Sequence, residues 1–565
     1  MHKNTVKSGP SLANVEGSQA AAGLGKQIGI GLAACVLGYG VAIAAAAETT
    51  PAATSADVSP SYASSPGADA ERPWWSPGGS EVMPKYSTYK NELGTLAILN
   101  ADGPVDTKNH PFFRAATSNG RACVTCHQPS SGMSISASKA QERWDATNGS
   151  DPLFAAFDGS NCPNLPQADK SSHSLLLDRG LFRIPMPWPP RDLDGKAIKP
   201  EFSIEVISDP TGCNTSKKYG LESANPTVSV YRRPRIVANL KYVESEKPLG
   251  LWQVRSGELL PVDKENGNRL AGNLMSDGRE ATLRSQMVSA MTGHLETHDV
   301  PSKADREMIR QFEMQIYAAQ VSSNVGGSLQ EGGAHLGPSA LLEGKTGLLG
   351  AFPHRTTFPE IDGWRTQRTS AAITWPPVMK PPVPPASREG ESSESPAQRE
   401  YRDSVARGFD LFLYRQFLIR NVGSLNQLLG NPVKQSCANC HNMQRTGQDN
   451  APGYLGLGTN TYPYATPAPD LPLFKVTCRK DSPPHPYLGR EIYTSDPGRA
   501  LFTGRCADVG AATAQQMRAL AARAPYFSGG SAKTLREVIE FYDRRFNIGY
   551  TERDVQDLVN FLGAL

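Results

Sequence analysis

The sequence has almost no excess of charge of either sign. Its 58 lysine and arginine residues face 55 aspartate and glutamate residues, a formal net charge of +3. Such a balance gives no reason to expect nucleic acid or an anionic membrane surface as the main partner. With 39% apolar and 20% charged residues, the chain is neither collagen-like nor wholly disordered. Its 565 residues are too many for one core, so we expect two domains plus linkers.

Cysteine is scarce, with nine residues, and four of them fall in two C-x-x-C-H motifs. In this motif two thiols one helical turn apart add to the vinyl groups of a haem, and the adjacent histidine ligates the iron. A zinc site or a redox dithiol is the alternative, but zinc takes four ligands from paired motifs. The motifs predict two covalently bound haem c groups on Cys123, Cys126, Cys437 and Cys440, with His127 and His441 as iron ligands.

Five cysteines remain, of which Cys35 lies in the N-terminal segment. The other four favour disulfides in an oxidising compartment, and three connectivities are open to them. We favour the local pairs, Cys162 with Cys213 and Cys478 with Cys506. Free buried thiols are the alternative.

The N-terminus contains one long uncharged run, Ile28 to Ala47, preceded by lysines. The run ends in an A-x-A site at Ala45 to Ala47 and predicts a signal peptide over residues 1–47. Two alternatives stay open: a lipobox ending at Cys35, or an uncleaved membrane anchor. All three export the chain and predict a periplasmic protein. Residues 48–85, rich in Ala, Ser, Thr and Pro, are expected to be a low-complexity tether.

The helical periodicity of the remaining chain predicts a mainly α fold with two cytochrome c-like haem domains joined by long loop-rich insertions. Residues 86–325 are assigned to the N-terminal haem domain and residues 401–565 to the C-terminal haem domain. The Gly- and Pro-rich residues 326–400 connect them. Three helices begin at capping residues Ser302, Thr534 and Thr551, and a fourth carries the apolar stripe Val405, Phe409, Phe412 and Leu413.

One further helix combines an apolar face with a polar residue. Leu283, Gln286, Met287, Ala290 and Met291 share a face at helical spacing, and Glu296 follows the helix. A polar side chain on an apolar face needs a hydrogen-bond partner. Cleavage of peroxide at a haem needs an open face on the iron and a neighbouring group that transfers protons, and Gln286 and Glu296 are candidates for that group. The alternative is that Gln286 is a hydrogen-bonded amide in the core and that Glu296 is a solvated carboxylate in a loop.

The ordered motifs of the chain resemble those of the bacterial diheme cytochrome c peroxidases and the related MauG-type enzymes. The resemblance rests on the two C-x-x-C-H motifs, on SVYRRPRIVANLKY, on SDGRE followed by Gln286 and Glu296, and on RAPYFSGGSAKTLREVIEFY. It covers roughly residues 105–130, 225–320 and 405–565. It implies that His127 serves the peroxidatic haem, with Gln286 and Glu296 on its distal side and Glu296 as acid and base. His441 would serve the electron-transfer haem.

The chain departs from the family's pattern in ways that change expectations. No histidine follows the first motif closely, so we expect an open resting haem, unless His173 or His298 closes it. At the family's methionine position stands Tyr542, either a candidate iron ligand or a packed core residue; Met443 and Met517 do not match that position. Ser276 replaces the tryptophan between the haems and Ser528 the histidine of PYFH. Arg232 aligns with a calcium-binding asparagine, so calcium is less expected here than in the family.

The sequence therefore predicts a diheme c-type peroxidase, an oxidoreductase that reduces hydrogen peroxide to water. Its electrons would come from a small donor protein, a cytochrome c or a cupredoxin, or from a quinol-linked donor. Two alternatives stay open. One is MauG-like oxidation of a protein or organic substrate, favoured by Tyr542 and disfavoured by Ser276. The other is a non-catalytic diheme electron-transfer cytochrome, which has no need of Glu296 beside Gln286.

Overall fold

The computed structural model describes residues 72–192, 195–244, 274–280, 282–344, 359–364, 394–441 and 454–565. All of them belong to one compact unit, Gly67–Leu565. The predicted division into domains at residues 325 and 400 stays a prediction. The predicted signal peptide, lipobox and most of the tether lie outside the described residues. Within the described ranges, no helix is both long and apolar enough to cross a membrane.

Sheets are much more prominent than the sequence predicted. The described residues form six sheets, all antiparallel. The largest has the order β2–β3–β8–β9 and contains β2 (Tyr86–Asn91), β3 (Gly94–Asn100), β8 (Ile316–Ser323) and β9 (Gly327–Ser328). Strand β3 lies inside this sheet, and Leu96, Ala97 and Ile98 are fully buried. A sheet therefore supports the N-terminal region.

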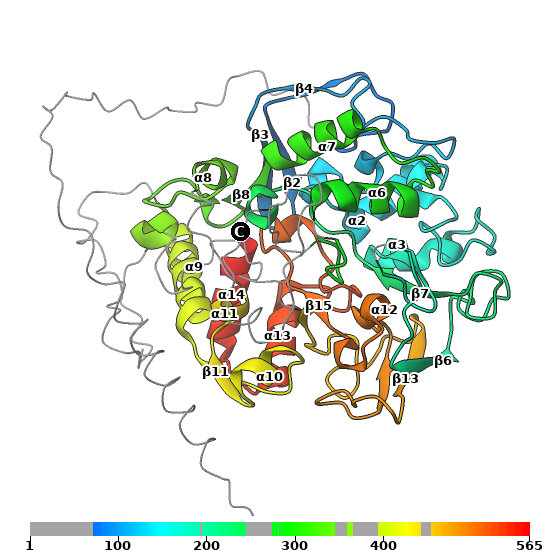
Figure 1. Ribbon diagram of the computed structural model, residues 1–565. Coiled ribbons are helices and arrows are strands. Elements are labelled where there is room, and N and C mark those ends of the chain that lie inside the picture. The colour runs from blue at the N-terminus through cyan, green and yellow to red at the C-terminus, as the bar shows by residue number, and fades with distance from the viewer. Residues whose placement is uncertain are drawn as a thin grey trace, which may run out of the picture. The chain divides into compact units, whose positions relative to one another are not determined.

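A second sheet joins distant parts of the chain. Strand β13 (Leu473–Cys478) pairs on one side with β14 (Glu491–Thr494) and on the other with β6 (Phe202–Ser208). In Figure 1, β6 and β13 accordingly lie side by side. The disulfide Cys478–Cys506 leaves the end of β13, and Cys162–Cys213 is the other disulfide. Both predicted pairings are confirmed.

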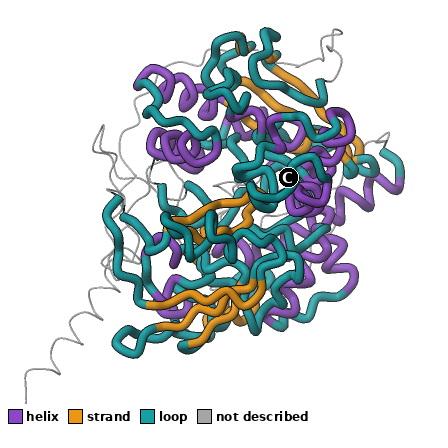
Figure 2. Tube along the Cα trace, turned by 90° about the vertical axis from the view of Figure 1, so that its right-hand side faces the viewer, coloured by secondary structure: helices purple, strands orange, loops and turns teal. Residues whose placement is uncertain are grey.

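The remaining sheets are two-stranded. They pair β1 (Val82–Met83) with β4 (Val105–Asp106), β5 (Phe182–Pro187) with β7 (Thr227–Arg232), β10 (Phe417–Ile419) with β11 (Val433–Gln435), and β12 (Tyr454–Leu455) with β15 (Ala512–Thr513). Figure 2 shows the strands of the described chain, in orange, among long loops.

The prediction of a mainly α fold with two cytochrome c-like haem domains and loop-rich insertions is wrong. The described chain is a mixed α and β fold, because segments taken as loops pair as strands. In β6 and β13 residues alternate between a buried and a more exposed face, which is the pattern of a half-covered sheet. These strands are short and their partners are distant, so helical periodicity gave no sign of them.

The predicted helices themselves are present. They are α6 (Leu283–His294), α7 (Lys303–Gln315), α9 (Pro396–Tyr414), α13 (Leu535–Phe546) and α14 (Glu552–Gly563), with N-caps Ser302, Thr534 and Thr551 as expected. The stripe of α9 is buried. On α7, Met308 is exposed, and Ile316, directly after the helix, begins β8. Shorter helices are α2 (Ala137–Thr147), α3 (Ser174–Arg179), α4 (Lys241–Glu244), α8 (Pro338–Glu343), α10 (Leu425–Leu429), α11 (Cys437–Cys440) and α12 (Ala500–Thr503).

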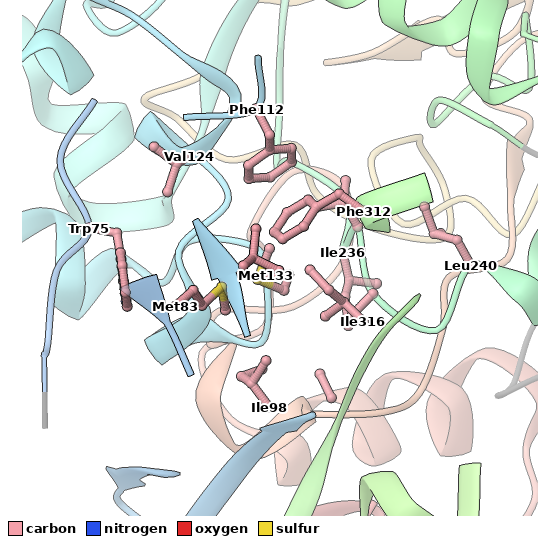
Figure 3. Packing of buried hydrophobic residues seen from close by; sticks show 14 of the residues in the cluster. Trp75, Met83, Ile98, Phe112, Val124, Met133, Ile236, Leu240, Phe312 and Ile316 are labelled. Atoms are coloured by element: carbon pink, nitrogen blue, oxygen red, sulfur yellow. The ribbon is translucent and has the colours of Figure 1, made fainter. Parts of the chain in front are cut away.

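Two large apolar clusters surround the two C-x-x-C-H motifs. Figure 3 shows the first, in which Val124 of the first motif packs with Met133, Ile236 and Phe312. The second contains Ala438 of the second motif and the facing sides of α9, α13 and α14. Each motif is thus built into its own core.

Helices α9 and α14 lie in close contact, as Figure 1 shows. A Cβ atom on Gly408 of α9 would overlap the backbone carbonyl of Asp557 on α14, so only glycine permits this approach. The buried Asp557 carboxylate accepts hydrogen bonds from Ser404 Oγ at 2.6 Å and from Arg407 Nε at 2.8 Å. Arg407 also binds Glu400, whose side chain is 67% exposed, against 5% for Asp557.

We expect Asp557→Asn to lower the free energy of unfolding by about 2–4 kcal/mol, because it breaks a buried ion pair. Glu400→Gln is the matched control on the same arginine and should cost at most about 1 kcal/mol, because exposed pairs contribute little. Denaturant unfolding measures both. Equal losses of unfolding free energy in the two variants would show that burial does not determine how much the Arg407–Asp557 pair contributes.

Candidate functional site

The first C-x-x-C-H motif lines a pocket. About 1360 Å³ of the pocket is free of protein atoms, part of it open to solvent. Cys123, Cys126 and His127 form one wall, and α6 forms another. The lining is mostly apolar: Ile236, Val237 and Leu240 follow β7, Leu274 precedes α6, and Leu283, Met287 and Met291 belong to α6 itself. The pocket is a cavity of the kind that holds a flat apolar cofactor.

His127 is held ready to act as a ligand. Its Nδ1 lies 3.1 Å from the backbone carbonyl oxygen of Met133. A bond from Nδ1–H to this carbonyl leaves the Nε2 lone pair for a metal, the usual arrangement of ligating histidines. Burial lowers the pKa of His127 to about 4, so the imidazole is neutral at neutral pH, as ligation requires.

Three of the motif cysteines, Cys123, Cys126 and Cys437, are held as thiols rather than thiolates, because burial raises the pKa of each. Burial is the main cause that raises the pKa of Cys126 to about 12 and that of Cys437 to about 11. None of the four motif cysteines is in a disulfide. Zinc ligands and redox dithiols act as thiolates, so these environments do not favour either alternative.

Helix α6 brings Gln286 to the first pocket but not Glu296. Thr282 caps the helix by accepting a hydrogen bond from the Ser285 backbone, and Gln286, Met287 and Ala290 line the pocket. Glu296 follows the helix at a φ of 54°, is exposed, and accepts a hydrogen bond of 3.0 Å from Asn119 Nδ2. The two residues that the sequence paired therefore lie in different surroundings.

A histidine that the sequence analysis passed over lines the pocket instead. His294, in the last turn of α6, is bonded through Nδ1 to Asp158 Oδ2 at 2.7 Å. Asp158 also lines the pocket and is ion-paired with Arg121, both side chains being 1% exposed. No local pattern could have found this group, since Asp158 and His294 are 136 positions apart.

The two histidines considered as distal ligands do not line the first pocket. His173 is fully buried, with Nδ1 2.8 Å from the Gly159 carbonyl and Nε2 3.0 Å from the Gln167 carbonyl. His298 is exposed. Neither is placed to close an iron site in the described pocket.

The second motif lines a second pocket, with about 1670 Å³ free of protein atoms and partly open to solvent. Cys437, Cys440, His441 and Tyr542 all line it. The rings of His441 and Tyr542 lie perpendicular, with their centroids 6.4 Å apart. Tyr542 therefore faces the interior of the second pocket, a position compatible with either a ligand or a core residue. Met517 lines the same pocket, and Met443 lies outside the described residues.

The two pockets share a wall. Arg233, Pro234, Arg235, Gln515 and Gln516 line both of them, and none of these five is aromatic. Ser276 lines the first pocket and Ser528 the second. The described wall between the pockets therefore consists of charged, polar and aliphatic groups.

This shared wall is positively charged. Arg233 donates to the backbone carbonyls of Arg179, Ile135 and Arg523. Arg523 lines the second pocket, and its buried Nε has no hydrogen-bond partner among the described residues. Burial lowers the pKa of Arg233 to about 9 and that of Arg523 to about 10, so both are still cations at neutral pH. An anionic group stabilises buried cations of this kind, so this wall would suit a ligand that carries carboxylates.

The cofactor prediction, two covalently bound haem c groups with calcium doubtful, requires correction. The described residues contain no group of three or more His, Cys, Asp or Glu side chains that could hold a metal ion, so this part of the polypeptide builds no metal centre by itself. The carboxylates that could serve calcium, Asp277 and Asp496, are bound to Arg232 at 2.8 and 2.7 Å. Calcium is therefore dropped.

No protein-family model, no curated protein and no solved structure matches this chain.

The network around Arg232 gives a stability prediction. Asp277 is fully buried and also binds Arg279 at 2.7 Å. Burial alone would raise the pKa of Asp277, but Arg279 and Arg232 hold it below its usual range. Asp277→Asn should therefore lower the free energy of unfolding at pH 7 by about 3–5 kcal/mol. Asp145→Asn, in an exposed pair with Lys170, should change it by less than about 1 kcal/mol.

The same network sets a pH dependence. A carboxyl group whose pKa is lowered on folding stabilises the protein above its unfolded pKa of about 4 and loses this contribution as the pH falls further. The difference between wild type and Asp277→Asn should therefore narrow below about pH 4. Denaturant titrations between pH 3 and 7 measure it, and a constant difference would contradict the assignment.

Proposed function

We propose that the protein is a diheme c-type peroxidase, which reduces hydrogen peroxide to water with electrons from a small redox donor. The observation that carries the proposal is the placement of each C-x-x-C-H motif in the wall of its own apolar pocket. The cationic wall between the pockets supports it. The resemblance to the bacterial diheme cytochrome c peroxidases and MauG-type enzymes points the same way.

The first pocket is the proposed peroxide site. When bound there, a haem would supply the redox chemistry, with Cys123 and Cys126 as attachment points and His127 as the iron ligand. The Gln286 amide, on the α6 wall, would orient peroxide by hydrogen bonding. Met287 and Ala290 beside it keep that wall apolar and limit the access of water. The resemblance implies the acid and base role for Glu296, but the Glu296 carboxylate lies outside the pocket lining, so Glu296 is not placed at the proposed peroxide site.

The second pocket is the proposed point of electron entry, with Cys437, Cys440 and His441 in the corresponding roles. Tyr542 faces His441 there and favours MauG-like oxidation of a protein or organic substrate as the second candidate function. A phenolate ligand would stabilise oxidised iron. The electron donor is a cytochrome c, a cupredoxin or a quinol-linked donor.

An exported, periplasmic location is part of the proposal. Two disulfides, Cys162–Cys213 and Cys478–Cys506, support it because such bonds persist in oxidising compartments. Anchoring at the membrane through the N-terminus stays a prediction.

The function is tested by paired cysteine variants of the exported protein. Cys123→Ala with Cys126→Ala should abolish peroxide consumption, because it removes the peroxide site. Cys437→Ala with Cys440→Ala should leave a single reaction with peroxide but cut steady-state turnover with a reduced donor at least 100-fold. Peroxide consumption and haem absorbance are measured together. Wild-type protein that carries two haems and consumes no peroxide would overturn the proposal.

Tyr542 is tested by Tyr542→Phe. Loss of the hydroxyl should change the absorption spectrum of the second haem only, because Tyr542 lines only the second pocket. Tyr550→Phe is the control, since Tyr550 lines the same pocket and its hydroxyl lies 4.0 Å from Cys437 Sγ. An unchanged spectrum in Tyr542→Phe would make this residue a core tyrosine.

A further inference from the structure

His294 is the histidine besides His127 that lines the first pocket in the described structure. It lies on α6, two helical turns beyond Gln286, so both project from one helix into one cavity. Its side chain is 31% exposed. It is thus open to small molecules that enter the pocket.

A buried ion pair holds His294 in place. Asp158 Oδ2 lies 2.7 Å from His294 Nδ1, and the other oxygen of Asp158 binds Arg121. Arg121 also donates to the carbonyls of Pro152, Leu153 and His294 itself. The loop that carries Asp158 and the end of α6 are therefore fixed relative to one another.

The partner of His294 determines its tautomer. Burial alone would raise the pKa of Asp158, but Arg121 and His294 hold it below the usual range. Asp158 is therefore a carboxylate, which only accepts hydrogen bonds, so Nδ1 of His294 carries a proton. In the neutral ring Nε2 then has a lone pair, the arrangement of a histidine that acts as a general base.

We propose that His294 is the catalytic residue that transfers the proton of peroxide in the first pocket, and that Asp158 and Arg121 are its positioning residues. The proposal rests on the proposed peroxidase function and deepens it. It assigns to His294 the role that the resemblance gives to Glu296.

In this reaction His294 acts first as a base and then as an acid. Nε2 takes the proton from one peroxide oxygen, and Nε2–H returns it to the other oxygen as the oxygen–oxygen bond breaks, so that this oxygen leaves as water. The remaining oxygen is reduced to the second water by two electrons from the small redox donor and two protons from solvent. His294 ends in its starting protonation state.

Two carboxylates are rivals for this role. Glu296 is exposed and bound by Asn119. Glu313 of α7 is 4% exposed and lines the first pocket. Each of these two glutamates is replaced by glutamine. The two variants are compared with His294→Gln and Asp158→Asn, all in the full chain with both haems loaded.

Two measurements are made on each variant. The first is the rate of a single reaction with peroxide, followed by absorbance. The second is the equilibrium affinity of the oxidised protein for fluoride, a small anion that needs a nearby hydrogen-bond donor. Fluoride affinity requires no turnover and does not respond to a purely structural change elsewhere.

His294→Gln should slow the peroxide reaction about 100-fold or more, the usual contribution of a general acid and base, and weaken fluoride binding about 10-fold. Asp158→Asn should show a smaller loss in both, and Glu296→Gln and Glu313→Gln less than 3-fold. A His294→Gln protein within 3-fold of wild type in both measurements would overturn the inference alone. Wild-type protein that does not react with peroxide would overturn the proposed function with it.

Discussion

The buried contact of Arg232 with Asp277 and Asp496 is the interaction on which the rest of the structure depends. It ties the end of β7 to the SDGRE segment and to the residues after β14, three regions far apart in the sequence. Residues 233–235 follow directly and form the wall between the pockets. Separating the Arg232 guanidinium from either carboxylate would leave a buried charge without its partner, which is strongly unfavourable. The network therefore holds all three segments in one arrangement.

The helices could be predicted from the sequence because their signals are local. Ser302, Thr534 and Thr551 act as N-caps, and the α9 stripe is buried, as expected. The sheets could not be predicted in this way. Strand β6 pairs with β13 across nearly half of the chain, and a half-covered strand of seven residues resembles a loop when its partner is unknown.

The same difference between local and distant signals applies to the site. The C-x-x-C-H spacing and the helical position of Gln286 identified residues that line the pockets. Glu296 was expected beside Gln286, but a residue with φ of 54° after the helix end directs its side chain to Asn119. The Asp158–His294 pair depends on tertiary contacts alone. The sequence indicated that Arg232 stands at the position of a calcium-binding asparagine. In the structure the positive charge of Arg232 pairs with Asp277 and Asp496.

The central claim is that the first pocket reacts with peroxide and that the second supplies it with electrons. The most direct test is the absorption spectrum of the oxidised protein before and after one equivalent of hydrogen peroxide, followed by a reduced donor. We predict a change that is complete at one equivalent and is reversed by the donor. Two low-spin haem spectra that do not respond to peroxide would contradict the account.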